Sequence, residues 1–381
     1  MIKRSRIGIV LVAGTVLAAL SGWDASSQAC TNLMLKPQDG SVLYGRTMEF
    51  VTDVGSVILV APRNKEYIGT SLNGKPGMKW TARYGLVGTS AGPLPHVLEG
   101  LNEKGLAVGL FYFPGFATYM SVPADGDAKA IAAWELGTYL LGTCATVEEA
   151  KAALDGLIVC PAAQPDGSPA PPSHWMVRDA SGRCLIIEPT NGQLKTYDAP
   201  LGVVTNSPDY DWHMINLSNY SNQSALSVAP RMVSGVKIGP LSQGSGMLGL
   251  PGDFTSPSRF VRAVAFSQTA LPAANAQEGV LRVFHLMNLF DIPLGAARSQ
   301  NGTTVTADYT QYTIVGDLTN RKMYFHTFDS RGIRLVDLNK CDFDAKEFRC
   351  VPMDQKEVIQ DLTAQQKAFP PATQPTSQPV K

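Results

Sequence analysis

The chain has 381 residues, of which 44% are hydrophobic and 17% are charged, and its 32 Lys and Arg residues are balanced by 32 Asp and Glu residues. This balance argues against a nucleic-acid-binding protein, which carries a basic excess, and the apolar content argues against an intrinsically disordered chain. The 35 glycines and 26 prolines follow no fixed period, which argues against collagen-like and repeat architectures.

The first 29 residues have the pattern of a secretory signal peptide. Three basic residues precede an apolar run over residues 7–20, which is shorter than the ~20 residues that a membrane-spanning helix needs. Ser27 and Ala29 are small residues at positions that suit a signal peptidase cutting before Cys30. We therefore expect residues 1–29 to be removed and the mature protein to be exported to the periplasm or the cell exterior, without a membrane span.

Cys30 is the residue that this cleavage would expose, and three interpretations of it differ in function. As an N-terminal nucleophile, it would combine a thiol with a free α-amine whose pKa, ~7.7–8.0, allows it to act as a general base. As the attachment site of a lipoprotein anchor it would carry lipid, although Ser27 stands where such sites usually have an aliphatic residue. As an ordinary buried or disulfide-bonded cysteine it would have no catalytic role.

The mature chain begins with strand patterning, continues with helices and returns to strands. Segments rich in β-formers and bounded by turn residues predict strands over 32–35, 41–50, 56–62, 80–90 and 105–113. A segment rich in alanine and leucine predicts two helices, broken near Gly142, over 129–157. The second half predicts strands over 174–178 and 183–188, helices over 259–269 and 278–289, and strands over 310–315, 322–327 and 333–337.

This order of elements predicts one α+β domain over residues 30–348, in which stacked sheets lie between helices. Residues 349–381 are rich in proline towards the end and are predicted to form a disordered tail. Cys341 and Cys350 flank a short loop and could pair in an oxidising compartment, which the sequence leaves open.

Two short motifs suggest other chemistries. Residues 88–92 match the G-x-S-x-G nucleophile elbow of serine hydrolases, but Pro93 and Pro95 disfavour the helix that the elbow requires. Residues 244–249 match the G-x-G-x-x-G pattern of dinucleotide-binding folds, but no predicted strand leads into them. Neither motif outweighs Cys30, and the sequence indicates no cofactor and no metal site.

Six short motifs follow Cys30 in order along the chain. They are YGRTMEF at 44–50, LNEKGLA at 101–107, FPG at 113–115, VTNSP at 204–208, GLPGD at 249–253 and SPSRFVR at 256–262. Together with Cys30-Thr31 they resemble the choloylglycine hydrolase family, which includes bile salt hydrolases and penicillin V acylases. The resemblance implies the N-terminal nucleophile hydrolase fold, a four-layer αββα sandwich of two mostly antiparallel sheets. It also implies hydrolysis of a linear amide C–N bond without a cofactor or metal.

The resemblance further implies a role for each matching residue. Cys30 would be the nucleophile through its sulfur and the base through its α-amine, and Arg46 would lie beside the sulfur and favour the thiolate. Asn206 would donate to the oxyanion of the tetrahedral intermediate, with the Asn102 segment as the second donor. Arg259 would help to hold the charged groups near Cys30.

Glu49 departs from the family pattern, because members of the family often have Asp at this position. A carboxylate there would hold the α-amine in place. Glu49 would do so with a side chain that is one methylene longer, and the extra reach would shift the amine or reshape the pocket.

The expected partner is a small-molecule amide that joins an acyl group to a small polar amine. Penicillin V is the first candidate, and conjugated bile salts and N-acyl homoserine lactones are the alternatives. Phe111, Tyr112 and Phe113 are interpreted either as the lining of the acyl pocket or as core residues. A lipoprotein and a non-catalytic binding protein of the same fold are the alternatives from another class, and a homo-oligomer such as a tetramer is left open.

Overall fold

The computed structural model describes residues 29–92 and 94–367. The predicted signal peptide over residues 1–29 therefore lies outside the described residues except for Ala29, and so does the end of the predicted tail. Within the described ranges, no helix is both long and apolar enough to cross a membrane.

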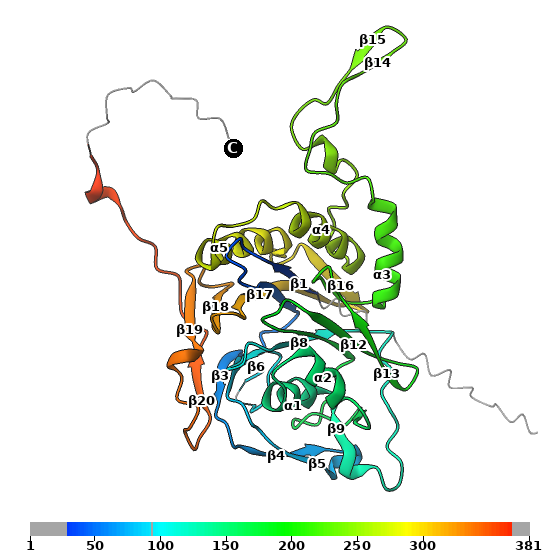
Figure 1. The fold of residues 1–381 in the computed structure, drawn as a ribbon, viewed down its shortest axis with the longest axis vertical. Coiled ribbons are helices and arrows are strands. Elements are labelled where there is room, and N and C mark those ends of the chain that lie inside the picture. Colours follow the sequence, from blue (N-terminus) through cyan, green and yellow to red (C-terminus); the bar gives the residue numbers. More distant parts are fainter. Residues whose placement is uncertain (1–28, 93, 368–381) are drawn as a thin grey trace, which may run out of the picture.

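Two antiparallel sheets stacked on each other form the centre of the fold (Figure 1). Each strand pairing within them is antiparallel. The first sheet contains β1 (Cys30–Leu35), β2 (Leu43–Phe50), β17 (Thr304–Asp317), β18 (Lys322–Thr327) and β19 (Arg334–Asp337) in this order, and β16 (Ala297–Asn301) pairs with β17. The second sheet contains, in order, β13 (Gln193–Asp198), β12 (Cys184–Thr190), β11 (Ser173–Arg178), β8 (Ala107–Tyr112), β7 (Glu99–Asn102), β6 (Leu86–Ser90), β3 (Val57–Ala61) and β20 (Arg349–Pro352).

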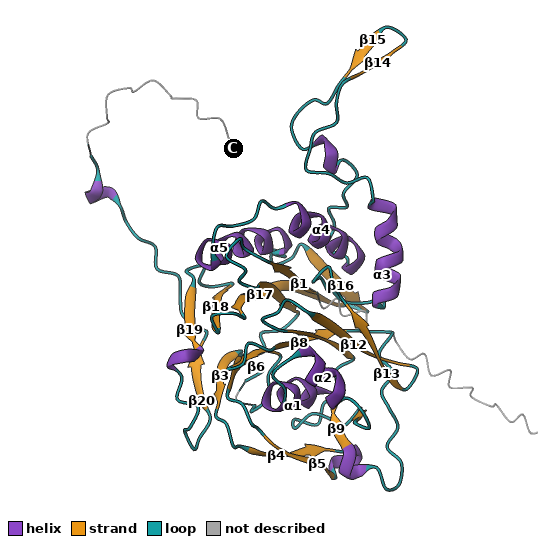
Figure 2. Cartoon of the chain, viewed as in Figure 1, coloured by secondary structure: helices purple, strands orange, loops and turns teal. Residues whose placement is uncertain are grey.

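Helices cover the outer face of each sheet (Figure 2). The first sheet packs against α4 (Ser256–Thr269) and α5 (Ala276–Met287), and the second packs against α1 (Leu136–Thr143) and α2 (Val147–Ala153). The remaining elements are α3 (Tyr210–Leu217) and three small two-stranded sheets: β4 (Glu66–Thr70) with β5 (Pro76–Thr81), β9 (Ala130–Ala132) with β10 (Ile158–Cys160), and β14 (Arg231–Val233) with β15 (Val236–Ile238). The layers confirm the predicted αββα sandwich.

Strand β2 is buried on both faces, and its alternation decides which side chains reach the space between the sheets. A Cβ atom at Gly45 would lie 2.5 Å from atoms of Val283 and Met287, so this face of β2 packs closely against α5. Tyr44, Arg46 and Met48 therefore point the other way, towards the second sheet. Cys30 is paired with Met48 across the two strands, so its side chain shares that face.

Three predicted elements differ from those observed. Residues 80–90 do not form one strand, because the backbone N–H groups of Arg83 and Tyr84 both donate to the Gly142 carbonyl and turn the chain out of β5 before β6 begins. The first residues of the predicted helical segment form β9 instead. The predicted tail begins too early, because Arg349–Pro352 pairs with β3 as an edge strand. Cys341 and Cys350 are both free thiols.

Candidate active site

Cys30 begins β1 and lies almost fully inside the molecule, with 5% of its surface exposed. Arg46 on the neighbouring strand donates from Nη2 to the Cys30 sulfur over 3.5 Å and to the Leu110 carbonyl over 3.0 Å. The second bond ties the guanidinium to the opposite sheet. A fixed positive charge therefore lies beside the thiol.

Asn206 joins the backbone nitrogen of Cys30 to the rest of the site. Its Oδ1 accepts from the Cys30 backbone N–H over 2.8 Å and from Arg259 over 2.8 Å. Its Nδ2 donates to the Tyr112 carbonyl over 2.7 Å. An amide nitrogen has two N–H groups, so a second donor remains beside Cys30.

Arg259, on the first turns of α4, bonds to three separate segments. Its Nη1 donates to the Cys30 carbonyl and to the Thr31 hydroxyl, while Nε donates to the Phe254 carbonyl over 2.9 Å. Its Nη2 donates to Oδ1 of Asn206. The side chain is 2% exposed, so these bonds satisfy a guanidinium that has almost no contact with solvent.

Glu49 lies on the opposite face of β2 from Arg46, on the side of the helices. Its Oε1 accepts from the Thr310 hydroxyl over 2.7 Å, whereas Oε2 is buried without a partner among the described residues. Burial raises the pKa of Glu49 to about 7, and the charge of Arg259 is the largest opposing influence. The Glu49 backbone N–H donates to the Ala29 carbonyl, but its carboxylate makes no hydrogen bond to Cys30 within the described part of the chain.

Asn102 is not part of this arrangement. It ends β7, where its Nδ2 donates to the Leu141 and Cys144 carbonyls, each over 2.8 Å. Its Oδ1 accepts from two backbone N–H groups of the following turn. Because all these bonds hold the turn and the end of α1 on the outer face of the second sheet, the prediction that Asn102 lies at the oxyanion is not supported by its position.

Two supporting residues had no predicted role. His213 on α3 donates from Nε2 to the Asn206 carbonyl over 2.9 Å and stacks on Phe260, and burial lowers the pKa of His213 to about 4. Ser256 accepts from the Asn206 backbone N–H through its hydroxyl. Ser256 lies in the SPSRFVR motif, whereas His213 lies outside the six motifs. Nothing in the sequence separates a residue that orients Asn206 from one that fills space.

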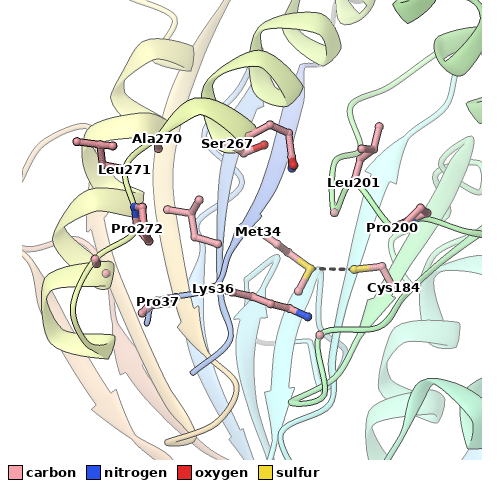
Figure 3. A pocket seen from close by; sticks show the side chains of 16 residues that line it. Met34, Lys36, Pro37, Cys184, Pro200, Leu201, Ser267, Ala270, Leu271 and Pro272 are labelled. Atoms are coloured by element: carbon pink, nitrogen blue, oxygen red, sulfur yellow. Dashed lines mark hydrogen bonds between the residues drawn. The ribbon is translucent and has the colours of Figure 1, made fainter. Parts of the chain in front are cut away.

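Two other candidate nucleophiles lie in other parts of the fold and contact other groups there. Ser90 of the G-x-S-x-G motif is buried in β6 and donates to the Leu94 carbonyl. Cys184 lines a cavity of about 300 Å³ at the far end of β1 from Cys30. Figure 3 shows its sulfur directed at that of Met34, 2.8 Å away, and burial raises the pKa of Cys184 to about 12. A thiol with that pKa is a poor nucleophile near neutral pH.

Comparisons with known proteins agree with this geometry. The family model described as linear amide C–N hydrolases, choloylglycine hydrolase family, matches residues 30–351. A bile salt hydrolase/transferase from Clostridium perfringens (strain 13 / Type A) is 32% identical over 324 residues, which cover 84% of this chain and 95% of that protein. One from Lactiplantibacillus plantarum is 29% identical over 316 residues, covering 81% and 93%.

Solved structures show the same fold. The crystal structure of a mutant conjugated bile acid hydrolase from Clostridium perfringens matches with a TM-score of 0.78 and 28% identity, over 88% of this chain and all of that one. Penicillin V acylase from Agrobacterium tumefaciens has a TM-score of 0.68 at 24% identity, over 85% and 91% of the two chains. The resemblance read from the six motifs is thereby confirmed: the chain belongs to the choloylglycine hydrolase family and is a hydrolase of linear amide C–N bonds.

Proposed function

We propose that the protein is an exported N-terminal cysteine hydrolase that cleaves its amide through an acyl-thioester on Cys30. The observation that carries this proposal is the meeting of four groups at one buried point. The Cys30 nitrogen and sulfur lie within hydrogen-bond range of Asn206 and Arg46, respectively, and Arg259 joins Cys30 to Asn206.

Each chemical step uses one of these groups. The Cys30 thiolate attacks the amide carbon, and the carbonyl electrons move to the oxygen, where the second N–H of Asn206 stabilises the charge. The intermediate collapses as the C–N bond breaks, and the protonated α-amine of Cys30 gives its proton to the leaving amine. Water, deprotonated by the same α-amine, then attacks the thioester carbon, and the C–S bond breaks to release the acid and the Cys30 thiolate, while the proton stays on the α-amine for the next cycle.

The nitrogen can act as a base only after residues 1–29 have been removed. In the unprocessed chain this atom is an amide whose single N–H is held by Asn206, and an amide has no basic lone pair. Cleavage converts it into an amine at the same place. We propose that the unpartnered Glu49 Oε2 then becomes an acceptor for the new α-ammonium, which gives the longer side chain the role that Asp often has in the family.

The acyl group is proposed to be aromatic or otherwise apolar, with penicillin V as the first candidate. Phe111 and Phe113 are fully buried, so the core interpretation holds for both. Phe116 is 42% exposed and packs on Phe113, with ring centroids 5.6 Å apart. Tyr112 is only partly buried, and its backbone carbonyl accepts from Asn206. Its side chain alternates with that of Phe111, which packs with Cys30, and therefore lies on the other face of β8. The bile salt hydrolase relatives favour conjugated bile salts as the second candidate.

A homo-oligomer is proposed from the arm formed by residues 222–250, which projects from the body beyond α3 and carries the β14–β15 hairpin (Figure 1). An isolated two-stranded hairpin is marginally stable in water. The arm nevertheless exposes large apolar side chains, among them Leu226 (80%), Met232 (64%), Val236 (62%) and Leu248 (84%). A second copy of the chain would cover them.

The function is tested with the purified mature protein and a panel of amides: penicillin V, glycine- and taurine-conjugated bile acids, and N-acyl homoserine lactones. Mass spectrometry should first give a free Cys30 at the N-terminus. We expect release of phenoxyacetate from penicillin V and no release by Cys30→Ala. A lipidated N-terminus, or no cleavage of any of these amides, would contradict the proposal.

Asn206→Ala and Asn102→Ala are expected to separate a catalytic amide from a structural one. The first should lower kcat/KM by ~10²–10³, because an oxyanion donor is lost. The second should lower the free energy of unfolding by ~1–3 kcal/mol, because buried carbonyls lose their donor, while the folded protein keeps its kcat/KM. The measurements are kcat/KM and urea unfolding of both variants. A larger loss of kcat/KM in Asn102→Ala than in Asn206→Ala would show that Asn102 belongs to the active site.

Glu49→Gln is expected to change how stability depends on pH in the unprocessed chain. The pKa of Glu49 is raised from 4.5 to about 7 on folding, so the unfolded carboxyl ionises first. The wild-type chain should therefore lose roughly 3 kcal/mol relative to Glu49→Gln as pH rises from about 4.5 to above 7. Urea unfolding across this range measures the difference. If the free energy of unfolding depends on pH in the same way for both proteins, Glu49 is not a buried acid with a raised pKa.

The double variant M232K/V236K is expected to break the oligomer, because it places two charges in the apolar surface of the arm. The wild-type protein should sediment as an oligomer and the variant as a monomer at the same concentration. Ile68→Lys is the matched control, since Ile68 is 59% exposed on β4, outside the arm. If the wild-type protein sediments as a monomer, the proposed homo-oligomer is wrong.

A further inference from the structure

Four side chains form a continuous buried line between the sheets, starting at Cys30. Arg46 donates to the Cys30 sulfur, and its Nε lies 3.8 Å from Oε2 of Glu99 on β7. The other oxygen of Glu99 accepts from Nη2 of Arg178 on β11. Arg46 is 2% exposed and the side chains of Glu99 and Arg178 are 0% exposed, so solvent screens none of these charges.

The charges along this line do not cancel unless Cys30 is ionised. Two guanidinium groups and one carboxylate leave one positive charge in excess, and a buried charge without a counter-ion is strongly destabilising. The Cys30 thiolate supplies the missing negative charge. Without Arg178, the Glu99 carboxylate would neutralise Arg46, and the thiolate would then be the unbalanced group.

A glycine and two aromatic residues beside these charged side chains accommodate them and hold them in place. Gly109 lies directly opposite Glu99 in the neighbouring strand β8, and a Cβ atom there would overlap the Glu99 carboxylate. The Arg178 guanidinium lies 3.6 Å above the ring of Tyr44, and that of Arg46 lies 5.2 Å from the centre of Phe111. Aromatic faces attract a cation without neutralising it. Both arginines are thus held in place while their charge is kept.

Other ionisable groups around the thiol do not remove this imbalance. Tyr312 on β17 stays neutral, because burial raises the pKa of its hydroxyl. Arg259 lies on the helix side of the first sheet, where Glu49 and Asp308 are its acidic neighbours and Arg262 is a basic one. The Arg46, Glu99 and Arg178 group therefore remains the source of the excess positive charge.

We propose that Glu99 and Arg178 are positioning residues that set the ionisation of Cys30 through Arg46, with opposite signs. Arg178 favours the thiolate because it pairs with the Glu99 carboxylate. Glu99 opposes the thiolate because it competes with the thiolate for the positive charge of Arg46. This inference rests on the proposed function, in which Cys30 attacks as a thiolate. It extends that function to two residues that touch neither the substrate nor the sulfur.

The test is the pH dependence of Cys30 alkylation by iodoacetamide in the mature protein, followed by peptide mass spectrometry so that the other five cysteines are distinguished. Iodoacetamide reacts with thiolates, so the midpoint of the rate profile reports ionisation. In Arg178→Met the midpoint should rise by about one pH unit, and in Glu99→Gln it should fall by about as much. Arg178→Lys, which keeps the charge, should restore the midpoint of the wild-type protein.

A purely structural role predicts a different outcome, because loss of packing would not move the two midpoints in opposite directions. Unchanged midpoints, or shifts of the same sign, overturn the inference. If either single variant fails to fold, E99Q/R178M removes both charges together, and its midpoint should match that of the wild-type protein; a displaced midpoint overturns the inference as well. Alkylation needs no amide substrate, so failure of the proposed hydrolysis would show in the substrate panel and leave this test unaffected.

Discussion

The contacts of Arg259 are the interaction on which the rest of the site depends. One guanidinium, carried by α4, bonds to the carbonyl of Cys30, the hydroxyl of Thr31 and the amide of Asn206. The Asn206 segment is far from β1 in the sequence, and a bridge between Asn32 and Val204 places the two side by side. Because the group is buried, leaving any of these donors unpaired would cost free energy, so the helix, β1 and the Asn206 segment have to be placed together.

The space between the sheets is unusual for a protein core, because it holds fixed charges among large apolar side chains. The first sheet contributes Cys30 and Arg46, and the second contributes Glu99 and Arg178. Low polarity strengthens each interaction and makes each unbalanced charge costly. The sandwich therefore does more than support the thiol. On the role proposed for Glu99 and Arg178, it makes the charge state of Cys30 part of the stability of the core.

The sequence was sufficient to predict the layers of the fold and the site residues that lie within short motifs. Strand periodicity predicted most of β1, β2, β8 and β11, and the resemblance identified Cys30, Arg46, Asn206 and Arg259, which the fold brings together. Asn102 was misplaced because its role came from the match of the LNEKGLA motif, and a motif match does not tell on which face of a sheet the last residue of a strand lies. Glu99 and Arg178 are 79 residues apart and meet only through the pairing of β7, β8 and β11, so no local pattern could join them.

The burial of Ala29 has a consequence for the order of events in the life of the chain. Ala29 is 2% exposed, its carbonyl accepts from Glu49, and the next nitrogen is held by Asn206. A peptidase needs the bond it cuts to be accessible in an extended segment, and the folded sandwich does not offer that bond. On the proposal that residues 1–29 are removed, their removal must precede closure of the sheets, or the edge of β1 must open first. The proposed maturation would thus compete with folding, and a chain that folds first would keep the proposed base of Cys30 as an amide.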